Sequence, residues 1–300
     1  MVKAFVQAAR LRTLPLAIGS IVVGSALAAF FYEHDWRITA LALLTAILLQ
    51  VLSNFANDYG DFKKGTDDDT RQDRALASGS LTIHQMKNAL ILTSILTLIC
   101  GVSLLWISFD SVNFGFIGLF VIGLLSIGAA IKYTVGKNPY GYSTLGDVAV
   151  FIFFGLVAVL GTYYLQSGKF DHGFYASIVP ACAIGLLATG VLNINNIRDI
   201  EGDKMNGKIT LAARLGKSAA EYYQLVLVLW GVGLLFLFFQ RSTSSQGLLV
   251  LLVGGLFIFH WLKLRSLQNT KENRPAYNKL LKFHVLLSLL MVIVMTLMLR

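Results

Sequence analysis

Acidic and amide side chains at helical spacing mark the first candidate site. Four of them stand at positions i, i+3, i+4 and i+7 after the apolar run 38–52: Asn54, Asn57, Asp58 and Asp61. A helix through these positions places all four on one face. Mg²⁺ prefers oxygen ligands, typically one or two carboxylates plus substrate phosphates. This face is therefore a candidate metal and phosphate site; the alternative is a solvated helix end followed by an acidic loop.

A second stretch repeats the pattern at the end of another apolar run, where Asn195, Asp199 and Asp203 fall at i, i+4 and i+8. A shift of 142 positions maps polar residues on polar residues and a glycine on a glycine: Asn54 on Asn196, Asn57 on Asp199, Asp61 on Asp203 and Gly65 on Gly207. A matched pair of this kind is hard to obtain by chance. We therefore expect a single domain over residues 1–300, in which residues 54–67 and 193–208 are pseudo-repeats with one site between them.

The elements that must position these side chains belong in a membrane. The 300 residues are 56% hydrophobic and 14% charged, with a mean hydropathy of +0.68, which excludes an ordinary soluble domain. Apolar runs long enough to cross a bilayer recur along the chain. We predict an all-α polytopic membrane protein with nine transmembrane helices around a central cavity that opens to the cytoplasmic side. The expected spans are 14–32, 38–57, 89–109, 113–133, 145–166, 173–195, 221–240, 246–262 and 280–299.

The basic residues predict the orientation. With nine spans, 21 of the 25 lysines and arginines fall on the side of the amino terminus, and basic loops face the cytoplasm. The amino terminus and both acidic stretches are therefore expected on the cytoplasmic side of the cell membrane. The net charge of +9 is explained by this loop topology, and we expect no nucleic-acid partner.

Cations accompany both acidic stretches. The first is followed by Lys64, Arg71 and Arg74, and the second contains Arg198, Lys204 and Lys208. Such a run is often only a solvated loop. Beside a metal–carboxylate site, however, cations suit a polyanionic substrate.

A loop over residues 131–147 combines aromatic and basic side chains with helix-stopping residues. Its members of interest are Lys132, Tyr133, Lys137 and Tyr142. They can line an aromatic-substrate pocket or form an interfacial aromatic belt, and composition alone favours the belt. Later in the chain, four polar or aromatic residues stand isolated and are assigned no role: Glu221, His260, Trp261 and His284.

The motifs together resemble a known family. The matching runs are Asn57-Asp58-x-x-Asp61, Arg74-x-Leu-Ala-Ser-Gly79, Tyr133 with Leu145-Gly146-Asp147, and Asn196-x-Arg198-Asp199-x-x-x-Asp203-x-x-x-Gly207-Lys208. They resemble the intramembrane aromatic prenyltransferases of the UbiA superfamily. The opening from Ala9 to Pro15 is similar to the branch that acts on 1,4-dihydroxy-2-naphthoate in menaquinone synthesis. Departures from the family pattern occur at Leu11, Ala75 and Gly141, and at the last of these Lys137 or Lys132 would supply a charge.

The resemblance implies a reaction and a set of roles. A Mg²⁺-dependent enzyme would transfer a polyprenyl group from polyprenyl diphosphate to 1,4-dihydroxy-2-naphthoate, with release of diphosphate and CO₂, and without an obligate protein partner. The implied catalytic residues are Asp58, Asp61, Asp199 and Asp203. The implied metal ligands are Asn54, Asn57, Asp58, Asp61, Asn196, Asp199 and Asp203. The implied diphosphate ligands are Asn57, Lys64, Arg71, Arg74, Asn196, Arg198, Lys204 and Lys208. The implied acceptor ligands are Lys132, Tyr133, Lys137 and Tyr142.

Other functions remain open at this stage. Within the same class the acceptor is 4-hydroxybenzoate, homogentisate or another ring. A secondary transporter also combines repeats with polar residues in interrupted helices, but transporter sites lie near the bilayer midplane and these stretches lie at helix ends. A purely structural membrane protein leaves the two matched acidic faces unexplained.

Overall fold

Every regular element that the structure describes is a helix. The computed structural model describes residues 1–65, 74–240, 244–270 and 272–299. The elements are α1 (Val2–Ala9), η1 (Leu11–Thr13), α2 (Leu14–Phe31), α3 (Trp36–Lys63), α4 (Ile83–Phe109), α5 (Phe114–Lys132), η2 (Tyr140–Tyr142), α6 (Leu145–Val150), η3 (Phe151–Leu160), α7 (Gly161–Ser167), α8 (His172–Ala176), α9 (Ile178–Met205), α10 (Leu211–Leu215), α11 (Lys217–Gln240), α12 (Ser244–Ser266) and α13 (Arg274–Met298).

Nine helical segments of the described chain are long and apolar enough to cross a membrane, so the predicted all-α, nine-span architecture is confirmed. Several helices run further than the predicted spans, and in two of them the added turns carry an acidic stretch. The second span, expected to stop at 57, continues as α3 to Lys63, and the sixth, expected to stop at 195, continues as α9 to Met205. Their polar ends remain helical, so the acidic stretches lie on helices and not in loops.

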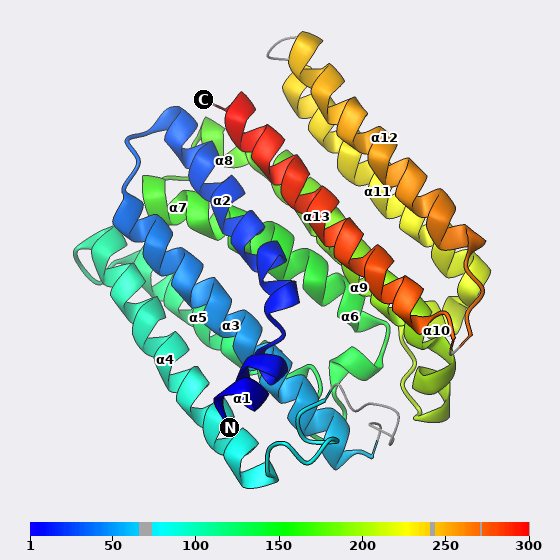
Figure 1. Cartoon of the computed structure of the whole chain (residues 1–300). Helices are drawn as coiled ribbons and strands as arrows, with labels where there is room; N and C mark the ends of the chain where they lie inside the picture. Colours follow the sequence, from blue (N-terminus) through cyan, green and yellow to red (C-terminus); the bar gives the residue numbers. More distant parts are fainter. Residues whose placement is uncertain (66–73, 241–243, 271, 300) are drawn as a thin grey trace.

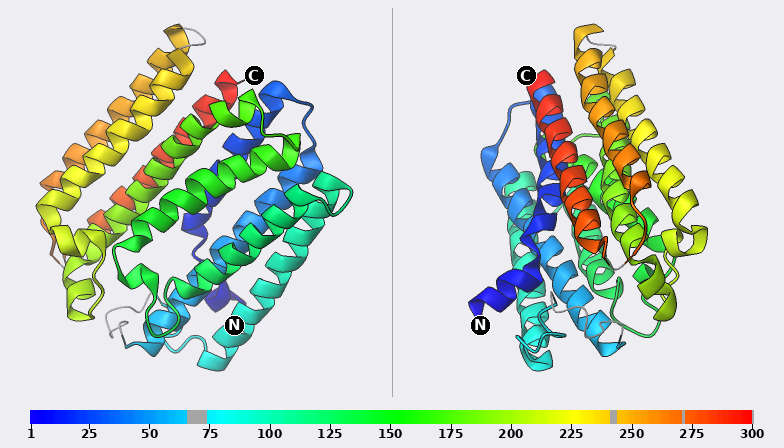
Figure 2. Two further views of the ribbon diagram at one scale, coloured as in Figure 1. Left: turned by 180° about the vertical axis from the view of Figure 1, so that it is seen from behind. Right: turned by 45° about the vertical axis from the view of Figure 1, so that its right-hand side comes forward.

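The helices form two packed groups. In the amino-terminal half, α3, α4 and α5 pack against one another, and α2 joins them to η3 and α13. In the carboxyl-terminal half, α9 packs against α11, α13, η3, α6 and α10. The hairpin of α11 and α12 lies at the outer edge of the bundle in both orientations (Figures 1 and 2). Helix α9 is thus the element around which the second half is built.

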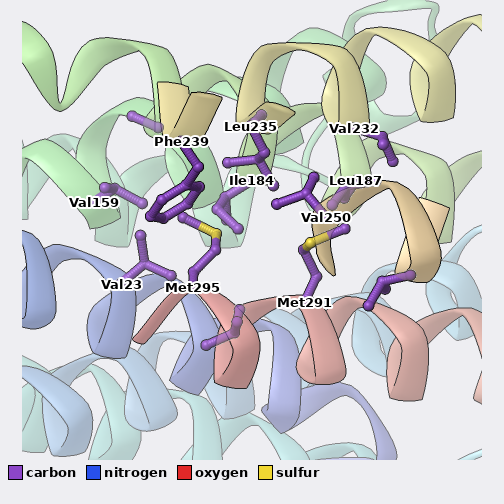
Figure 3. Close-up of a cluster of buried hydrophobic side chains, with 14 of the residues drawn as sticks. Val23, Val159, Ile184, Leu187, Val232, Leu235, Phe239, Val250, Met291 and Met295 are labelled. Atoms are coloured by element: carbon purple, nitrogen blue, oxygen red, sulfur yellow. The ribbon is translucent and has the colours of Figure 1, made fainter. Parts of the chain in front are cut away.

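An apolar core fastens α2 to the carboxyl-terminal half. Figure 3 shows its central side chains, which come from α2, η3, α9, α11, α12 and α13: Val23, Val159, Ile184, Leu187, Val232, Leu235, Phe239, Val250, Met291 and Met295. Close approach here depends on Gly24, because a Cβ at this position would lie 2.4 Å from the Val159 carbonyl oxygen of η3. That segment, η3, is wound as a π-helix. The core includes residues of α9, the helix that carries the second acidic stretch, and packs that helix against α2, η3, α11, α12 and α13.

The polar ends of the helices gather at one end of the molecule. The carboxyl end of α3, the turn that follows α5, and α10 all lie at the lower end in Figure 1. The connection between α2 and α3 lies at the opposite end, beside the carboxyl terminus. The two acidic stretches are therefore delivered to the same end of the bundle.

Candidate functional site

The first acidic cluster, Asn54, Asn57, Asp58 and Asp61, lies on the last three turns of α3. Asn54, Asp58 and Asp61 are buried, with 3%, 1% and 5% of their surface exposed, and Asn57 is half-buried. The helical spacing thus directs all four side chains inward. Carboxylates buried at the end of a membrane helix are costly and mark a functional site by default.

The second acidic cluster, Asn195, Asn196, Asp199 and Asp203, lies at the corresponding end of α9. Asn196, Asp199 and Asp203 are buried, and Asn195 is half-buried. The helices that carry the two clusters also end alike. Gly65 and Gly207 both adopt the left-handed conformation, with φ of 67° and 68°. A residue with a Cβ is strained in that conformation, which explains a glycine at both places.

Equivalent hydrogen bonds close the two helices. The Gly65 amide donates to the Phe62 carbonyl at 3.1 Å, and 142 positions later the Gly207 amide donates to the Lys204 carbonyl at 3.2 Å. One residue earlier, the Lys64 and Asn206 amides each donate to the carbonyl of a glycine four residues back, at 3.1 Å in both cases. The likeness between the two stretches therefore extends from residue type to backbone geometry.

Two arginines pair with the carboxylates of the first cluster. Arg74 is buried and reaches Asp58 at 2.9 Å and Asp61 at 3.2 Å, while Arg10 reaches Asp58 at 3.1 Å. The Ala75 amide also donates to Asp58 at 3.1 Å. Arg71, expected to act beside them, lies outside the described residues.

The asparagines of the first cluster tie α3 to its neighbours. The Asn54 amide donates to the Ala9 carbonyl at 2.9 Å and to the Thr13 hydroxyl at 3.1 Å. Asn57 accepts a hydrogen bond from Thr134 at 3.2 Å. These contacts fix the segment between α1 and α2 and the turn after α5 against the first cluster.

The second cluster has cationic partners of its own. Arg198 pairs with Asp199 at 2.5 Å and donates to Asn195 at 2.8 Å. Arg274 at the start of α13 reaches Asp199 at 3.0 Å, and Lys208 lies 3.7 Å from Asp203. Each cluster thus combines buried carboxylates with cations. Lys204, predicted as a diphosphate ligand, is exposed at the helix end.

Tyr142 connects the two clusters. Its hydroxyl donates to Asp61 at 2.8 Å. Its ring makes cation–π contacts with one lysine that follows each cluster: Lys64 Nζ lies 4.3 Å and Lys208 Nζ 5.4 Å from the ring centre. Its carbonyl accepts from the Ile209 amide at 2.9 Å. The structure therefore brings the two acidic clusters to either side of one tyrosine.

A cavity of about 410 Å³ adjoins the clusters. Most of its lining is apolar and comes from α2, α3, α4, α5, η3 and α9, including Phe153 and Phe154. Its polar lining includes Arg10, Asn54, Asn57, Tyr133, Tyr140 and Asn195. An apolar chamber that ends in amide, guanidinium and phenol groups suits a molecule with a long apolar tail and a polar head.

The tyrosines after α5 turn inward and do not form the outward-facing belt that composition favours. Tyr133 and Tyr140 line the cavity, with their ring centres 5.2 Å apart, and the Tyr140 hydroxyl donates to the Ala129 carbonyl at 2.8 Å. Burial raises the pKa of Tyr140 to about 12. Burial also raises the pKa of Tyr133, as do the negative charges of nearby groups that include Asp61 and Asp203. Tyr133 therefore stays protonated, so its hydroxyl is able to donate a hydrogen bond.

The other predicted acceptor ligands lie differently. Tyr142 contacts the clusters and is absent from the cavity lining, and the side chains of Lys132 and Lys137 are exposed and also outside that lining. The sequence analysis did not single out the roles of Arg10, Arg274 and Asn278. Asn278 is uncharged, and its side-chain oxygen accepts a hydrogen bond from Arg198 at 2.6 Å. Arg10 belongs to the amino-terminal motif that resembles the naphthoate branch, and this was the available signal. Nothing in the sequence marked the other two.

A known family model matches most of the chain. The model of the UbiA prenyltransferase family matches residues 17–290. The chain belongs to this family. Over 294 residues this UbiA-family chain is 42% identical to the 1,4-dihydroxy-2-naphthoate octaprenyltransferase of Escherichia coli (strain K12), with 97% of this chain and 94% of that protein covered.

Solved structures share the UbiA fold. The apo structure of a UbiA homolog from Aeropyrum pernix K1 has a TM-score of 0.71 at 17% identity, and covers 96% of this chain and 97% of its own. A UbiA homolog from Archaeoglobus fulgidus, bound to GPP and Mg²⁺, has a TM-score of 0.64 at 14% identity and covers 96% of this chain and 99% of its own. At these identities the likeness establishes the fold.

The donor chemistry of the site fits magnesium in combination with a diphosphate. Among the residues that the structure describes, no three His, Cys, Asp or Glu side chains gather into a ready-made metal site. The carboxylates instead come as one pair per cluster, Asp58 with Asp61 and Asp199 with Asp203, accompanied by amide oxygens. Mg²⁺ is typically held by one or two carboxylates with substrate phosphates and water filling its octahedron. This set of oxygen donors therefore suits an ion whose coordination a diphosphate completes.

Proposed function

We propose that this chain transfers a polyprenyl group from polyprenyl diphosphate to 1,4-dihydroxy-2-naphthoate, releasing diphosphate and CO₂. One observation carries the proposal: two acidic clusters with cationic partners meet across Tyr142 beside an apolar cavity. Such a site accommodates a diphosphate at its polar end and an isoprenoid chain in the cavity. The choice of acceptor rests on the 42% identity to the naphthoate enzyme.

The metal and diphosphate sites are assigned to the two clusters. Asp58, Asp61, Asp199 and Asp203 would hold Mg²⁺, with Asn54, Asn57 and Asn196 assisting. When bound, magnesium stabilises the negative charge that develops on the leaving diphosphate. Arg10, Arg74, Arg198 and Lys208 already lie on these carboxylates. Together with Lys64, Arg71 and Lys204 they would supply fixed positive charge to the diphosphate.

The chain's own residues account for the remaining chemistry. In the reaction the bond between the allylic carbon and the diphosphate oxygen breaks and its electron pair leaves with the diphosphate. The ring carbon that bears the carboxylate then bonds to the allylic carbon. The bond between this ring carbon and the carboxylate breaks, CO₂ leaves, and the electron pair of the broken bond restores the aromatic ring. The apolar cavity walls exclude water from the allylic cation. Tyr133, held protonated, orients the acceptor as a hydrogen-bond donor, with Tyr142, Lys132 and Lys137 as further acceptor candidates.

We also propose that the active site lies on the cytoplasmic face of the cell membrane. The bias of 21 of 25 basic residues toward the side of the amino terminus supports this orientation. The alike ends of α3 and α9 support a single domain over residues 1–300 built from two pseudo-repeats.

The proposal is tested with purified protein in nanodiscs. Octaprenyl diphosphate, Mg²⁺ and each candidate acceptor are incubated separately, and prenylated product and diphosphate are quantified. We expect product with the naphthoate and none with 4-hydroxybenzoate or homogentisate. Asp61→Asn and Asp203→Asn should each reduce turnover by at least about 10³-fold at an unchanged melting temperature, and chelation of Mg²⁺ should abolish it. Turnover that survives the chelator, or either variant, would contradict the two-cluster model.

A further inference from the structure

Four buried polar residues meet behind the second acidic cluster, one from each of four helices. They are Asn193 on α9, Gln224 on α11, His260 on α12 and His284 on α13, and we call them the buried polar cluster. None has any exposed surface, at 0% each. The two histidines stand isolated along the sequence and were assigned no role, so their meeting is a product of helix packing.

Contacts join the four residues of the buried polar cluster in two pairs. Asn193 donates to the Gln224 side chain at 2.9 Å and to the Ala220 carbonyl at 3.0 Å. The rings of His284 and His260 lie 5.1 Å apart, and His260 contacts the Leu280 carbonyl through Nε2 at 2.9 Å. The first pair therefore connects α9 to α11, and the second connects α12 to α13.

The two pairs of side chains come together at Gly190. A Cβ at Gly190 would lie 2.8 Å from Gln224 Nε2 and 2.9 Å from His284 Nε2. Both side chains thus approach the backbone of α9 at the same point, where only a glycine leaves room. Because this point is three residues before Asn193, the contacts constrain one short stretch of α9 from two neighbouring helices.

Stability does not explain the cluster. Asn193 Oδ1, Gln224 Nε2 and His260 Nδ1 are buried without a hydrogen-bond partner among the described residues. Burying each of these atoms costs the free energy of its hydration, and no hydrogen bond offsets this cost. Apolar side chains of similar volume would fill the same space at no greater cost, as replacements of buried polar groups often do. The best-attested use of buried polar groups is to fix the register of packed helices.

We propose that the buried polar cluster fixes the rotation of α9 and thereby aims the second acidic cluster at the first. Helix α9 runs unbroken from Asn193 to Asp203, so its rotation is passed directly to the carboxylates. A carboxylate about 5–6 Å from the helix axis moves by about 1 Å when the helix turns by roughly 10°. A misplacement of about 1 Å can cost roughly 10²-fold in rate.

Helix α13 carries contacts to both the site and the cluster, which strengthens the inference. Arg274 and Asn278 reach Asp199 and Arg198, and His284 lies less than two turns further along the same helix. A rotation of α9 relative to α13 would therefore disturb the ion pair at Asp199 together with the buried contacts. The four residues of the buried polar cluster are positioning residues, since none of them lines the cavity.

The inference rests on the proposed function, and the experiment separates the two. The double variant Asn193→Leu/Gln224→Leu removes the amide pair at similar volume, and Asn193→Gln/Gln224→Asn exchanges the two amides and keeps the pair. Ser288→Ala is the matched control, since the buried Ser288 hydroxyl donates to the His284 carbonyl of its own helix and makes no other hydrogen bond within the described part of the chain. All are compared with the wild type for melting temperature, kcat, acceptor KM, and Mg²⁺-dependent binding of geranyl S-thiolodiphosphate by calorimetry.

The leucine pair should keep its melting temperature within about 4 °C, lose about 10- to 100-fold in kcat, and bind the Mg²⁺–diphosphate analogue more weakly, at an unchanged acceptor KM. The exchanged pair should recover most of kcat, and Ser288→Ala should match the wild type. A leucine pair with full kcat and normal analogue binding overturns the inference. So does a loss of activity that only follows the loss of folded protein.

If the leucine pair does not fold, Gly190→Ala supplies the same test, because its methyl group displaces Gln224 and His284 from α9. Full kcat in that variant overturns the inference. A wild type that binds the analogue but forms no product refutes the proposed function instead, and the effect of the variants on analogue binding then still decides the positioning role.

Discussion

Tyr142 links the two acidic clusters, through its hydroxyl to Asp61 and through its ring to Lys208, and two substitutions separate the contribution of the hydroxyl from that of the ring. Tyr142→Phe removes only the hydroxyl that donates to Asp61 at 2.8 Å. A hydrogen bond to a charged group contributes about 1.5–3 kcal/mol, and about 1.36 kcal/mol corresponds to tenfold in rate. If the hydroxyl holds Asp61 in its reactive position, kcat/KM falls by roughly 10- to 150-fold.

Tyr142→Ala also removes the ring that Lys64 and Lys208 approach at 4.3 and 5.4 Å. Each cation–π contact at such a site contributes about 0.5–1 kcal/mol. The two contacts together therefore predict a further loss of roughly 5- to 30-fold. The alanine variant should consequently be clearly worse than the phenylalanine variant.

The assay is the initial rate of product formation in nanodiscs, with melting temperatures measured in parallel. Tyr164→Phe serves as the control, because Tyr164 stacks on Phe170 next to α8, away from both clusters. The reasoning fails if Tyr142→Phe retains the wild-type rate. It also fails in part if the two Tyr142 variants are equally impaired, since the ring would then contribute nothing.

Three further predictions concern stability. Arg74→Ala leaves two buried carboxylates without their shared cation and should cost about 3–5 kcal/mol, seen as a lower melting temperature; an unchanged value would argue against the pairing. Gly24→Ala places a methyl group 2.4 Å from a carbonyl oxygen of η3 and should cost about 1–3 kcal/mol, whereas Gly118→Ala, with nothing within 4 Å, should be neutral. The hydrogen bond from Arg37 lowers the pKa of Asp35 to about 2, so the ionised form is favoured by folding. Its stabilisation is present above the unfolded pKa of about 4 and is lost as the pH falls toward 2; Asp35→Asn should flatten thermal stability over this range.

The membrane architecture and the helical placement of both clusters could be predicted from the sequence because their signals are local. Apolar runs of sufficient length specify spans without knowledge of their partners. The positions of Asn54 and Asp61 fix a helix face in the same way. The equivalence of Gly65 and Gly207 was visible as a repeat of residue types, and the structure adds that both occupy left-handed helix ends.

The partners of the carboxylates could not be predicted, because they depend on contacts between distant segments. Arg10 lies 48 positions from Asp58, and Arg274 lies 75 positions from Asp199. His260 and His284 meet only because α12 and α13 pack together. The sequence predicts Tyr142 as an acceptor ligand, but it could not distinguish a contact with Asp61 from a place in the cavity wall.

The distribution of arginines along the chain bears on how the protein is made. Among the described residues, Asp58 and Asp61 pair with two arginines that lie within the first 74 residues, so these partners are synthesised before the second repeat. Asp199 meets Arg198 at once but gains Arg274 only when α13 is synthesised. A carboxylate at the end of a membrane helix is costly without its partners. Helix α13 therefore supplies an ionic contact that the second half gains late in synthesis, and a nascent chain that stops short of α13 lacks the Arg274 partner of Asp199.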